Sequence, residues 1–332
     1  MRVVFWGTPE FATAPLRALI GEGFDVVAVV TQPDRPHGRS RSKLVPSPVK
    51  ELALEESIPV LQPEKPRGDD FIGQLRTFAP DVSVVVAYGH LIPKAVLDLP
   101  TMGSFNVHAS LLPKLRGAAP IQGAILGGFH ETGVTIMRMV PALDAGPMVL
   151  QAATPIAEDE TAGELALRLS ELGALALIEA MTLISLGRAH EEPQDDARAT
   201  YAGKIDRDSA RIDWMQPAVI VSRSIRAYDP KPGAHTLLRG APVKLFGARV
   251  LPHTNHAPGK VVAIEEEGMI VACGEGAVRV TQVQPAGRGR MTPAELQRGR
   301  SLKTGEKLAT RDEGRTRDEG RTRDEGRTRD EG

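Results

Sequence analysis

The first half of the chain alternates short apolar runs with segments of helical character, and this alternation limits the possible folds more than any other feature. Strands are expected at residues 3–6, 26–31, 58–61, 82–87 and 104–108. Helices are expected at 48–56, at 69–78, and in a first segment that kinks at Pro15 or begins only at Thr13. Strands that alternate with helices form right-handed βαβ units around a parallel sheet. The predicted fold class is therefore α/β, with a doubly wound, mostly parallel sheet.

The second half of the chain has a different pattern. One helix is expected within residues 214–228, and short strands follow at 235–238, 243–250, 260–264, 269–272 and 277–283. Turn residues such as Gly240, Pro252 and Gly268 separate these strands. Short strands at this spacing are typical of a small β-barrel. We therefore expect a barrel of the OB type, an architecture that commonly binds nucleic acid.

These patterns divide the chain into a first domain at 1–189, a linker at 190–205, a barrel domain at 206–305 and a tail at 306–332. The linker is assigned because its residues are mostly polar. Within the tail, residues 311–332 repeat Arg-Asp-Glu-Gly-Arg-Thr and contain no apolar side chain. Such a segment cannot bury a core, so we expect the tail to be disordered.

Asn106 and His108 occupy the end of the strand expected at 104–108. Residues two apart on a strand share a face, and α/β sheets bind ligands at the carboxyl ends of their strands. An amide can donate a hydrogen bond to an oxyanion, and an imidazole can move a proton near neutral pH. The two residues are therefore a candidate catalytic pair, although a lone Asn-x-His is more often an ordinary polar turn.

Asp144 lies in a loop rich in Pro and Gly after the strand expected at 132–139. On this sheet edge the carboxylate can face His108, orient its ring and raise its pKa. Without such a partner, an Asp in this setting would simply form a turn.

The charge of the chain is unevenly distributed. Residues 1–205 contain 18 Lys and Arg against 24 Asp and Glu, a net charge of −6, whereas residues 206–300 contain 14 against 9, a net charge of +5. A long loop after the second strand carries Arg39, Arg41 and Lys43. Basic loops and basic domains contact phosphate backbones, so we expect a nucleic-acid partner, with a solvated loop as the simpler alternative.

Several other classes of protein are excluded. Cys273 is the only cysteine, which rules out an internal disulfide and a cysteine-rich metal cluster and fits a reducing compartment. The sequence has neither a signal peptide nor a run of about 18 apolar residues, so we expect a cytoplasmic protein without a membrane segment. No glycine-rich dinucleotide or Walker motif is present, and no cluster has the spacing of metal ligands.

Over roughly residues 1–305 the chain resembles the methionyl-tRNA formyltransferase family. In the first domain, the resemblance rests on the motifs FWGTPEFA at 5–12, QPDRP at 32–36, PSPVK at 46–50, AYG at 87–89, NVHASLLP at 106–113 and RGAAPIQ at 116–122. In the second domain it rests on KI at 204–205, IDW at 212–214 and QPAG at 284–287. The sequence departs from the family at Val140, Ala142, Ala145 and Pro147 near Asp144, and Lys231 stands where the family often has Trp.

The resemblance implies a Rossmann-like catalytic domain and a reaction. The formyl group of 10-formyltetrahydrofolate, the co-substrate, would pass to the amino group of initiator methionyl-tRNA without a metal. Asn106 and protonated His108 would stabilise the oxyanion, and Asp144 would keep His108 charged and help remove the amine proton. The matching folate-contacting residues are Ser110, Leu111, Leu112, Pro113 and Tyr88. Arg39, Arg41 and Lys43 would contact the tRNA, and a monomer is expected.

Two other functions remain open at this point. A formyltransferase that acts on an amino-sugar nucleotide or on glycinamide ribonucleotide would use similar chemistry, but it would not need the basic loop and the basic second domain. A folate-binding or RNA-binding protein without catalysis would not need Asn106, His108 and Asp144 together.

Overall fold

The computed structural model describes residues 1–37, 43–252 and 255–309, and this part of the chain forms two compact units. The first unit comprises Met1–Ala124, His130–Ile156 and Glu164–Lys204. The second comprises Ile125–Phe129, Ala157–Gly163 and the described chain from Ile205 onward. The chain therefore passes finally from one unit to the other between Lys204 and Ile205.

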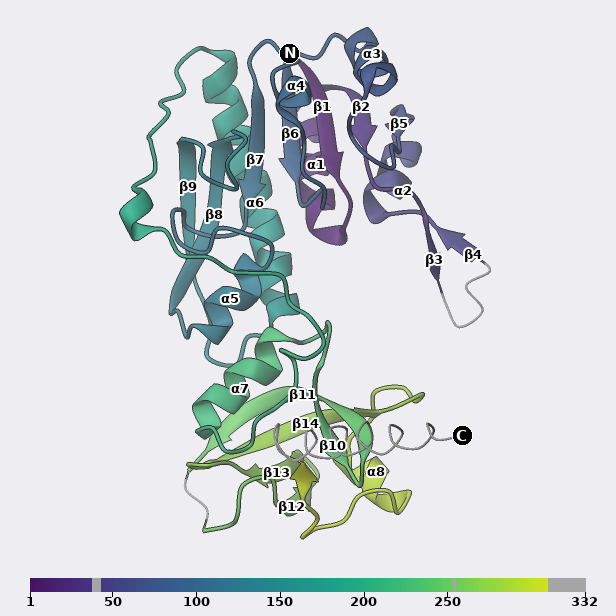
Figure 1. Ribbon diagram of the computed structural model, residues 1–332, viewed down its shortest axis with the longest axis vertical. Helices are drawn as coiled ribbons and strands as arrows, with labels where there is room; N and C mark the ends of the chain where they lie inside the picture. The colour runs from purple at the N-terminus through teal and green to yellow at the C-terminus, as the bar shows by residue number, and fades with distance from the viewer. Residues whose placement is uncertain (38–42, 253–254, 310–332) are drawn as a thin grey trace, which may run out of the picture. The chain divides into compact units, whose positions relative to one another are not determined.

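The first unit is built on a seven-stranded sheet with the order β5-β2-β1-β6-β7-β8-β9 (Figure 1). Its strands are β1 Arg2–Gly7, β2 Asp25–Val30, β5 Val60–Leu61, β6 Val82–Val86, β7 Ser104–His108, β8 Glu131–Arg138 and β9 Met148–Pro155. The pairs from β5 to β7 are parallel, while β8 pairs antiparallel with both β7 and β9. The predicted doubly wound, mostly parallel sheet is confirmed.

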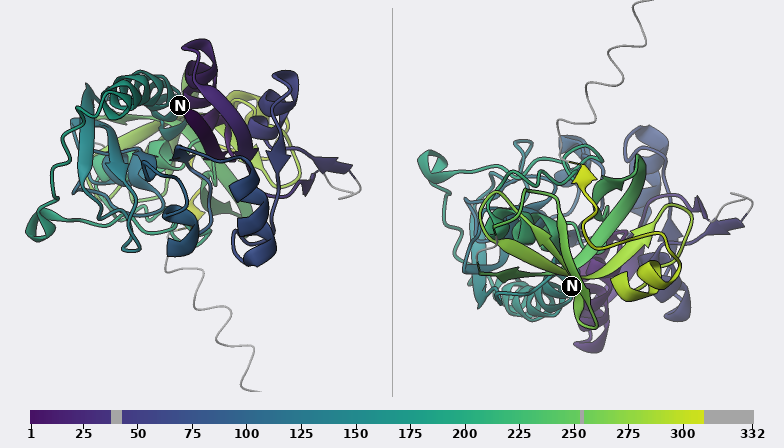
Figure 2. Two further views of the ribbon diagram at one scale, coloured as in Figure 1. Left: turned by 90° about the horizontal axis from the view of Figure 1, so that it is seen from above. Right: turned by 90° about the horizontal axis from the view of Figure 1, so that it is seen from below.

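Helices cover both faces of this sheet, as the view from above shows, with α1 and α6 on one face and α3 and α4 on the other (Figure 2). The α1 helix begins at Thr13, after the short 3-10 helix η1, so Pro15 lies in the first turn, where its missing N–H costs no hydrogen bond. The helical elements of this unit are η1 Glu10–Ala12, α1 Thr13–Gly21, α2 Pro48–Glu55, α3 Asp69–Thr77, α4 Lys94–Leu97, α5 Pro120–Leu126, α6 Ala162–Ser185 and η2 Asp196–Arg198.

Aromatic side chains build the core beneath the carboxyl ends of the central strands. Trp6 of β1 is buried, and its indole N–H donates to the hydroxyl of Ser83 on β6 at 3.2 Å. The ring of Tyr88, just beyond β6, packs edge-on against Trp6 with ring centres 5.2 Å apart. This packing fixes the backbone that follows β6 next to the end of β7.

The second unit is an antiparallel sheet of six strands, in the order β12-β13-β14-β11-β10-β15. A further antiparallel bridge joins Lys260, beside β12, to Lys307, beside β15, so the sheet curls until its two edges meet. The small barrel predicted for this half is confirmed. Its elements are α7 Ala218–Ala227, β10 Ala234–Leu238, β11 Ala241–Leu251, β12 Val261–Glu265, β13 Gly268–Ala272, β14 Ala277–Pro285, α8 Pro293–Arg298 and β15 Leu308–Ala309.

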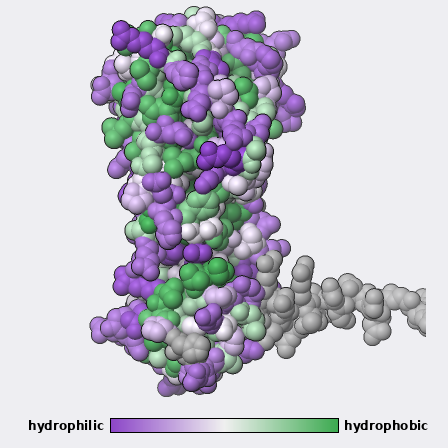
Figure 3. Space-filling model, turned by 90° about the vertical axis from the view of Figure 1, so that its left-hand side faces the viewer, coloured by the Kyte–Doolittle hydropathy of each residue, from purple (hydrophilic) through white to green (hydrophobic). Residues whose placement is uncertain are grey.

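The start of the predicted tail is folded rather than disordered, because Leu308 pairs with Leu238 in the barrel and Glu306 forms an ion pair with Arg239. The repeat at 311–332 lies outside the described residues. Exposed hydrophobic side chains of the second unit include Met215, Val219 and Val250. The face of the molecule drawn in Figure 3 mixes hydrophobic groups, in green, with hydrophilic ones, in purple.

Candidate active site

His108 ends β7, the strand that separates the parallel part of the sheet from its antiparallel part. The imidazole is buried, and its Nε2 lies 3.0 Å from the backbone oxygen of Leu115. A carbonyl oxygen only accepts hydrogen bonds, so Nε2 must carry the hydrogen. The nitrogen that can gain or lose a proton is therefore Nδ1.

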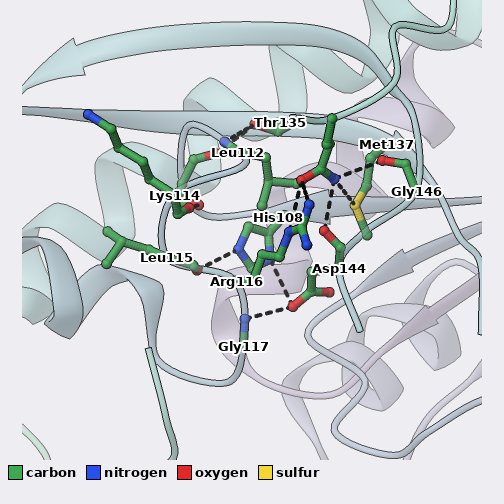
Figure 4. Close-up of polar contacts among 12 residues, drawn as sticks. His108, Leu112, Lys114, Leu115, Arg116, Gly117, Thr135, Met137, Asp144 and Gly146 are labelled. Atoms are coloured by element: carbon green, nitrogen blue, oxygen red, sulfur yellow. Dashed lines mark hydrogen bonds and ion pairs between the residues drawn. The ribbon is translucent and has the colours of Figure 1, made fainter. Parts of the chain in front are cut away.

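Asp144 faces that nitrogen, with Oδ2 3.8 Å from Nδ1 of His108 (Figure 4). The same carboxylate oxygen accepts a hydrogen bond from the backbone N–H of Gly117 at 2.8 Å. Gly117 has a φ of +113°, and a Cβ there would lie 2.6 Å from the backbone oxygen of Ala202. Only glycine fits this position without strain, and its N–H fixes one end of the Asp144 carboxylate.

The protonation state expected for His108 needs correction. Burial of the imidazole lowers the pKa of His108 below its ordinary value of 6.5, and the charge of Asp144 and the Leu115 carbonyl offset only part of this shift. The direction of the Asp144 effect is as predicted, but desolvation outweighs it. His108 is therefore neutral near pH 7 before substrate binds, rather than held charged.

Asn106 lies two residues before His108 on β7, on the same face of the strand. The residue is half-buried, and no protein group within the described residues makes a hydrogen bond with its side chain. Its strand neighbours are Val85 on β6 and Met137 on β8. The amide N–H groups of Asn106 are thus available to a ligand.

All three residues line one cavity of about 590 Å³ in the first unit. Its walls are mostly apolar, with Val85, Met137 and Met139 on the side of the sheet. A mainly apolar cavity of this size with a few convergent polar groups is the usual form of a small-molecule site. The cavity brings Asn106, His108 and Asp144 together as the sequence predicted.

Tyr88 also lines this cavity, but its ring is almost fully buried. Burial raises the pKa of its hydroxyl to about 12, so the phenol is neutral at physiological pH. The hydroxyl is buried and has no hydrogen-bond partner among the described residues. Tyr88 therefore supplies a neutral wall to the cavity.

The other predicted folate-contacting residues, Ser110, Leu111, Leu112 and Pro113, are absent from the lining of this cavity. The Ser110 hydroxyl donates to the backbone oxygen of Lys114 at 2.6 Å, and the Leu112 N–H donates to the Thr135 hydroxyl at 3.1 Å. These bonds close a tight loop. The loop carries Leu115 back to His108, so this segment acts on the site through the backbone.

The predicted tRNA-contacting residues are only partly described. Arg39 and Arg41 lie outside the described residues, and Lys43 begins β4 (Lys43–Val45), which pairs with β3 (Arg35–His37) in a short hairpin. The base of this hairpin is tied to the cavity wall, because the Gln32 amide donates to the backbone oxygen of Tyr88 at 2.9 Å. The described segment that leads into this hairpin therefore starts beside the candidate site.

Gln194, which the sequence did not indicate, completes the site together with Arg116. Arg116 and Gln194 bond to each other beside the Asp144 loop, although Gln194 belongs to the segment expected to be a linker. The two residues are 78 positions apart in the sequence, so no local pattern could predict this hydrogen bond. The RGAAP motif at 116–120 was the only signal for Arg116.

The described part of the chain offers no sign of a metal site or a membrane segment. It contains no group of three or more His, Cys, Asp and Glu side chains that could hold a metal ion. None of its helices is both long and apolar enough to cross a membrane.

Two family models match the chain. A model described as formyl transferase matches residues 1–181, and one described as formyl transferase, C-terminal domain, matches residues 204–301. The chain is 49% identical over 300 residues to a methionyl-tRNA formyltransferase of Pseudomonas paraeruginosa, a match that covers 90% of this chain and 96% of that one. It is 49% identical over 303 residues to one of Pseudomonas fluorescens, with 91% and 95% covered.

Solved structures share the fold at low sequence identity. HypX from Aquifex aeolicus in complex with tetrahydrofolic acid has a TM-score of 0.63 at 20% identity, covering 89% of this chain and 46% of that chain. An N-formyltransferase from Helicobacter canadensis, in complex with folinic acid and dTDP-3-aminofucose, has a TM-score of 0.63 at 18% identity, covering 85% and 98%. The two models that match both halves, together with the relatives of similar length, show that the chain belongs to the formyl transferase family and, within it, to the methionyl-tRNA formyltransferases.

Proposed function

We propose that the cavity around His108 transfers the formyl group of 10-formyltetrahydrofolate to the free amino group of methionyl-tRNA. The observation that carries this proposal is the convergence of Asn106, His108 and Asp144 on one cavity, in a chain whose relatives are methionyl-tRNA formyltransferases. The product is N-formylmethionyl-tRNA for the start of translation.

His108, Asn106 and Asp144 each have a separate role in formyl transfer. Nδ1 of neutral His108 takes a proton from the amine as it bonds to the formyl carbon. The Asn106 amide donates to the formyl oxygen as it becomes negative. The Asp144 carboxylate stabilises the imidazolium that results. When the bond between the formyl carbon and N10 of the folate breaks, His108 returns the proton to N10, and the enzyme regains its starting state.

The second unit provides support for a tRNA partner. A cavity of about 510 Å³ in this unit is lined by Arg207, Lys244 and Arg288, and its lining contains no acidic residue among the described residues. Burial, and then the charges of Arg207, Arg211 and Lys244, lower the pKa of His235 in the same wall, as expected where positive charge accumulates. Such a surface attracts a polyanion.

The proposal is tested by offering the enzyme alternative acceptors together with 10-formyltetrahydrofolate. Radiolabelled methionyl-tRNA is expected to be formylated, whereas an amino-sugar nucleotide and glycinamide ribonucleotide are expected to remain unmodified. Turnover of either small acceptor with none of methionyl-tRNA would refute the assignment. Tight folate binding without any turnover would identify a binding protein instead.

The basic loop gives a separate prediction. Replacing Arg39, Arg41 and Lys43 together by Gln should lower kcat/KM for methionyl-tRNA and flatten its dependence on salt. The slope of log kcat/KM against log salt should fall by about one for each phosphate that the variant no longer binds. The KM for 10-formyltetrahydrofolate should stay unchanged, because we assign these side chains to the tRNA and the folate to the cavity around His108.

The measurement is kcat/KM for methionyl-tRNA at several salt concentrations. A control variant with Lys65, Arg67 and Arg76 replaced by Gln removes the same charge from exposed positions outside the loop. An identical change of slope in both variants would mean that only net charge matters, and the loop would then have no direct contact with the tRNA.

We also propose that the enzyme is a monomer that works in the cytoplasm. Cys273 is a buried free thiol, and burial raises its pKa to about 12, so it is inert and fits a reducing compartment. Light scattering should give the mass of one chain, and a dimer mass that persists on dilution would contradict this proposal.

A further inference from the structure

The segment between α6 and the second unit runs along the candidate active site instead of spanning free solvent. Glu192 and Met148 exchange both backbone hydrogen bonds at 2.8 Å, which ties the segment to β9. Farther along, the Thr200 hydroxyl accepts from the Leu115 N–H at 2.9 Å. Leu115 is the residue whose carbonyl accepts from His108. The segment therefore holds the loop that carries Leu115, whose carbonyl fixes the His108 ring.

Gln194 lies between these two attachments, and its amide is fully hydrogen-bonded. Its oxygen accepts from Nε and Nη2 of Arg116 at 3.0 and 2.8 Å. Its nitrogen donates to the backbone oxygens of Asp144 and Gly146 at 2.8 and 2.7 Å. A guanidinium only donates, so Arg116 fixes which end of the amide faces the two carbonyls.

The loop that receives these bonds has one backbone conformation, at Asp144, that its own sequence does not favour. Asp144 adopts a φ of +48°, in the left-handed region that residues other than glycine seldom enter. At Gly146 a Cβ would lie 1.8 Å from the backbone oxygen of Arg138. Local preferences alone would let this loop relax, so contacts from outside must hold it.

We infer that Gln194 is a positioning residue for formyl transfer: by clamping the carbonyls of Asp144 and Gly146, it keeps the Asp144 carboxylate directed at Nδ1 of His108. Gly117 fixes the carboxylate from one side through its N–H, and Gln194 fixes the peptide from which the side chain extends. Arg116 is itself buried and also donates to Asp196 at 2.7 Å, so the clamp is anchored to a buried side chain. This inference rests on the function proposed above.

Two substitutions of Gln194 distinguish the effect of its hydrogen bonds from the effect of side-chain packing. Gln194→Met keeps the length of the side chain and removes its polar atoms. Gln194→Glu keeps an acceptor for Arg116 but loses both donors to the carbonyls at neutral pH. Both variants should lower kcat by about 10-fold to 100-fold, as small misplacements of catalytic groups do. The KM values for folate and tRNA should change less than twofold, because Gln194 does not line the cavity.

A matched control is Gln74→Met, since Gln74 is exposed on α3, and this variant should behave as the wild type. The second readout is the NMR titration of the His108 imidazole. In Gln194→Met the midpoint should move to lower pH, because a displaced Asp144 no longer opposes the effect of burial.

The outcomes are distinct. A fall in kcat together with a lower titration midpoint supports the clamp. An unchanged titration midpoint in Gln194→Met overturns it, whether kcat falls or not, because Asp144 then has not moved. If the wild type fails to formylate methionyl-tRNA, the proposed function is wrong, and the titration alone still decides whether Gln194 positions Asp144.

Discussion

Replacing His108 by Ala is expected to lower the single-turnover rate of formyl transfer by roughly 100-fold or more, because the variant has no group to accept the amine proton. The KM for 10-formyltetrahydrofolate should stay close to that of the wild type, since the cavity walls are mostly apolar side chains from other residues. The measurement is a single-turnover rate with radiolabelled methionyl-tRNA and excess enzyme.

The His108→Ala variant also leaves the Leu115 carbonyl without its donor, so a second variant is needed. His108→Gln retains an N–H that can reach this carbonyl, but an amide cannot accept a proton near pH 7. Equal losses in both variants would assign the effect to proton transfer. His190→Ala, at an exposed position, is the control. A rate near that of the wild type in His108→Gln would exclude His108 as the base.

Asn106→Ala is expected to lower the same rate by roughly 100-fold to 1000-fold, the usual effect of losing one oxyanion donor. The amide has no protein partner among the described residues, so its removal breaks no bond within the fold. The melting temperature should therefore change little. A large loss of activity at constant stability distinguishes a catalytic amide from a structural one.

An isosteric change sharpens this test. Asn106→Asp places a negative charge where the formyl oxygen becomes negative, so its rate should be lower still than that of Asn106→Ala. Asn255→Ala, at an exposed position of the second unit, should leave both rate and stability unchanged. If Asn106→Ala retained most of the activity, another donor would have to stabilise the oxyanion.

The sequence was most informative where local signals and burial agree. The apolar runs that became β1 and β6 are almost entirely buried, so their pattern is continuous. The helix expected at 48–56 is present as α2, and Ser47 caps it by accepting from the Lys50 N–H. By contrast, β9 alternates half-buried and exposed residues on a sheet edge and was not predicted. The α8 helix was also missed, although Thr292 and Glu295 form a capping box that the sequence contains.

The residues of the candidate site also fall into those that local sequence signals predicted and those that they did not. Asn106 and His108 share a strand, so their spacing was sufficient to predict that they act together. The contribution of Gln194 was hidden, because it bonds to a carbonyl 50 residues away and its own neighbours are polar. Ser110 to Pro113 stand beside His108 in sequence, yet the chain turns them away from the cavity. Position in sequence indicates which residues are near the site, but only the path of the loop decides which ones face it.

The protonation of His108 could not be predicted from residue types. Asp144 at 3.8 Å raises its pKa, as a neighbouring carboxylate should, but the surrounding core lowers it by more. The balance depends on how deeply the ring is buried, which is a property of the folded chain. This balance turns His108 from an expected cation into a base.

The role of His108 as a base is tested most directly by the protonation state of its imidazole ring. The measurement is a pH titration of the wild-type enzyme labelled with ¹⁵N in its histidines, with His108→Gln used to assign the signals. We expect a neutral ring near pH 7 with hydrogen on Nε2 and a lone pair on Nδ1, and a midpoint below the ordinary 6.5. A midpoint above that value, or a neutral ring with hydrogen on Nδ1, would contradict it.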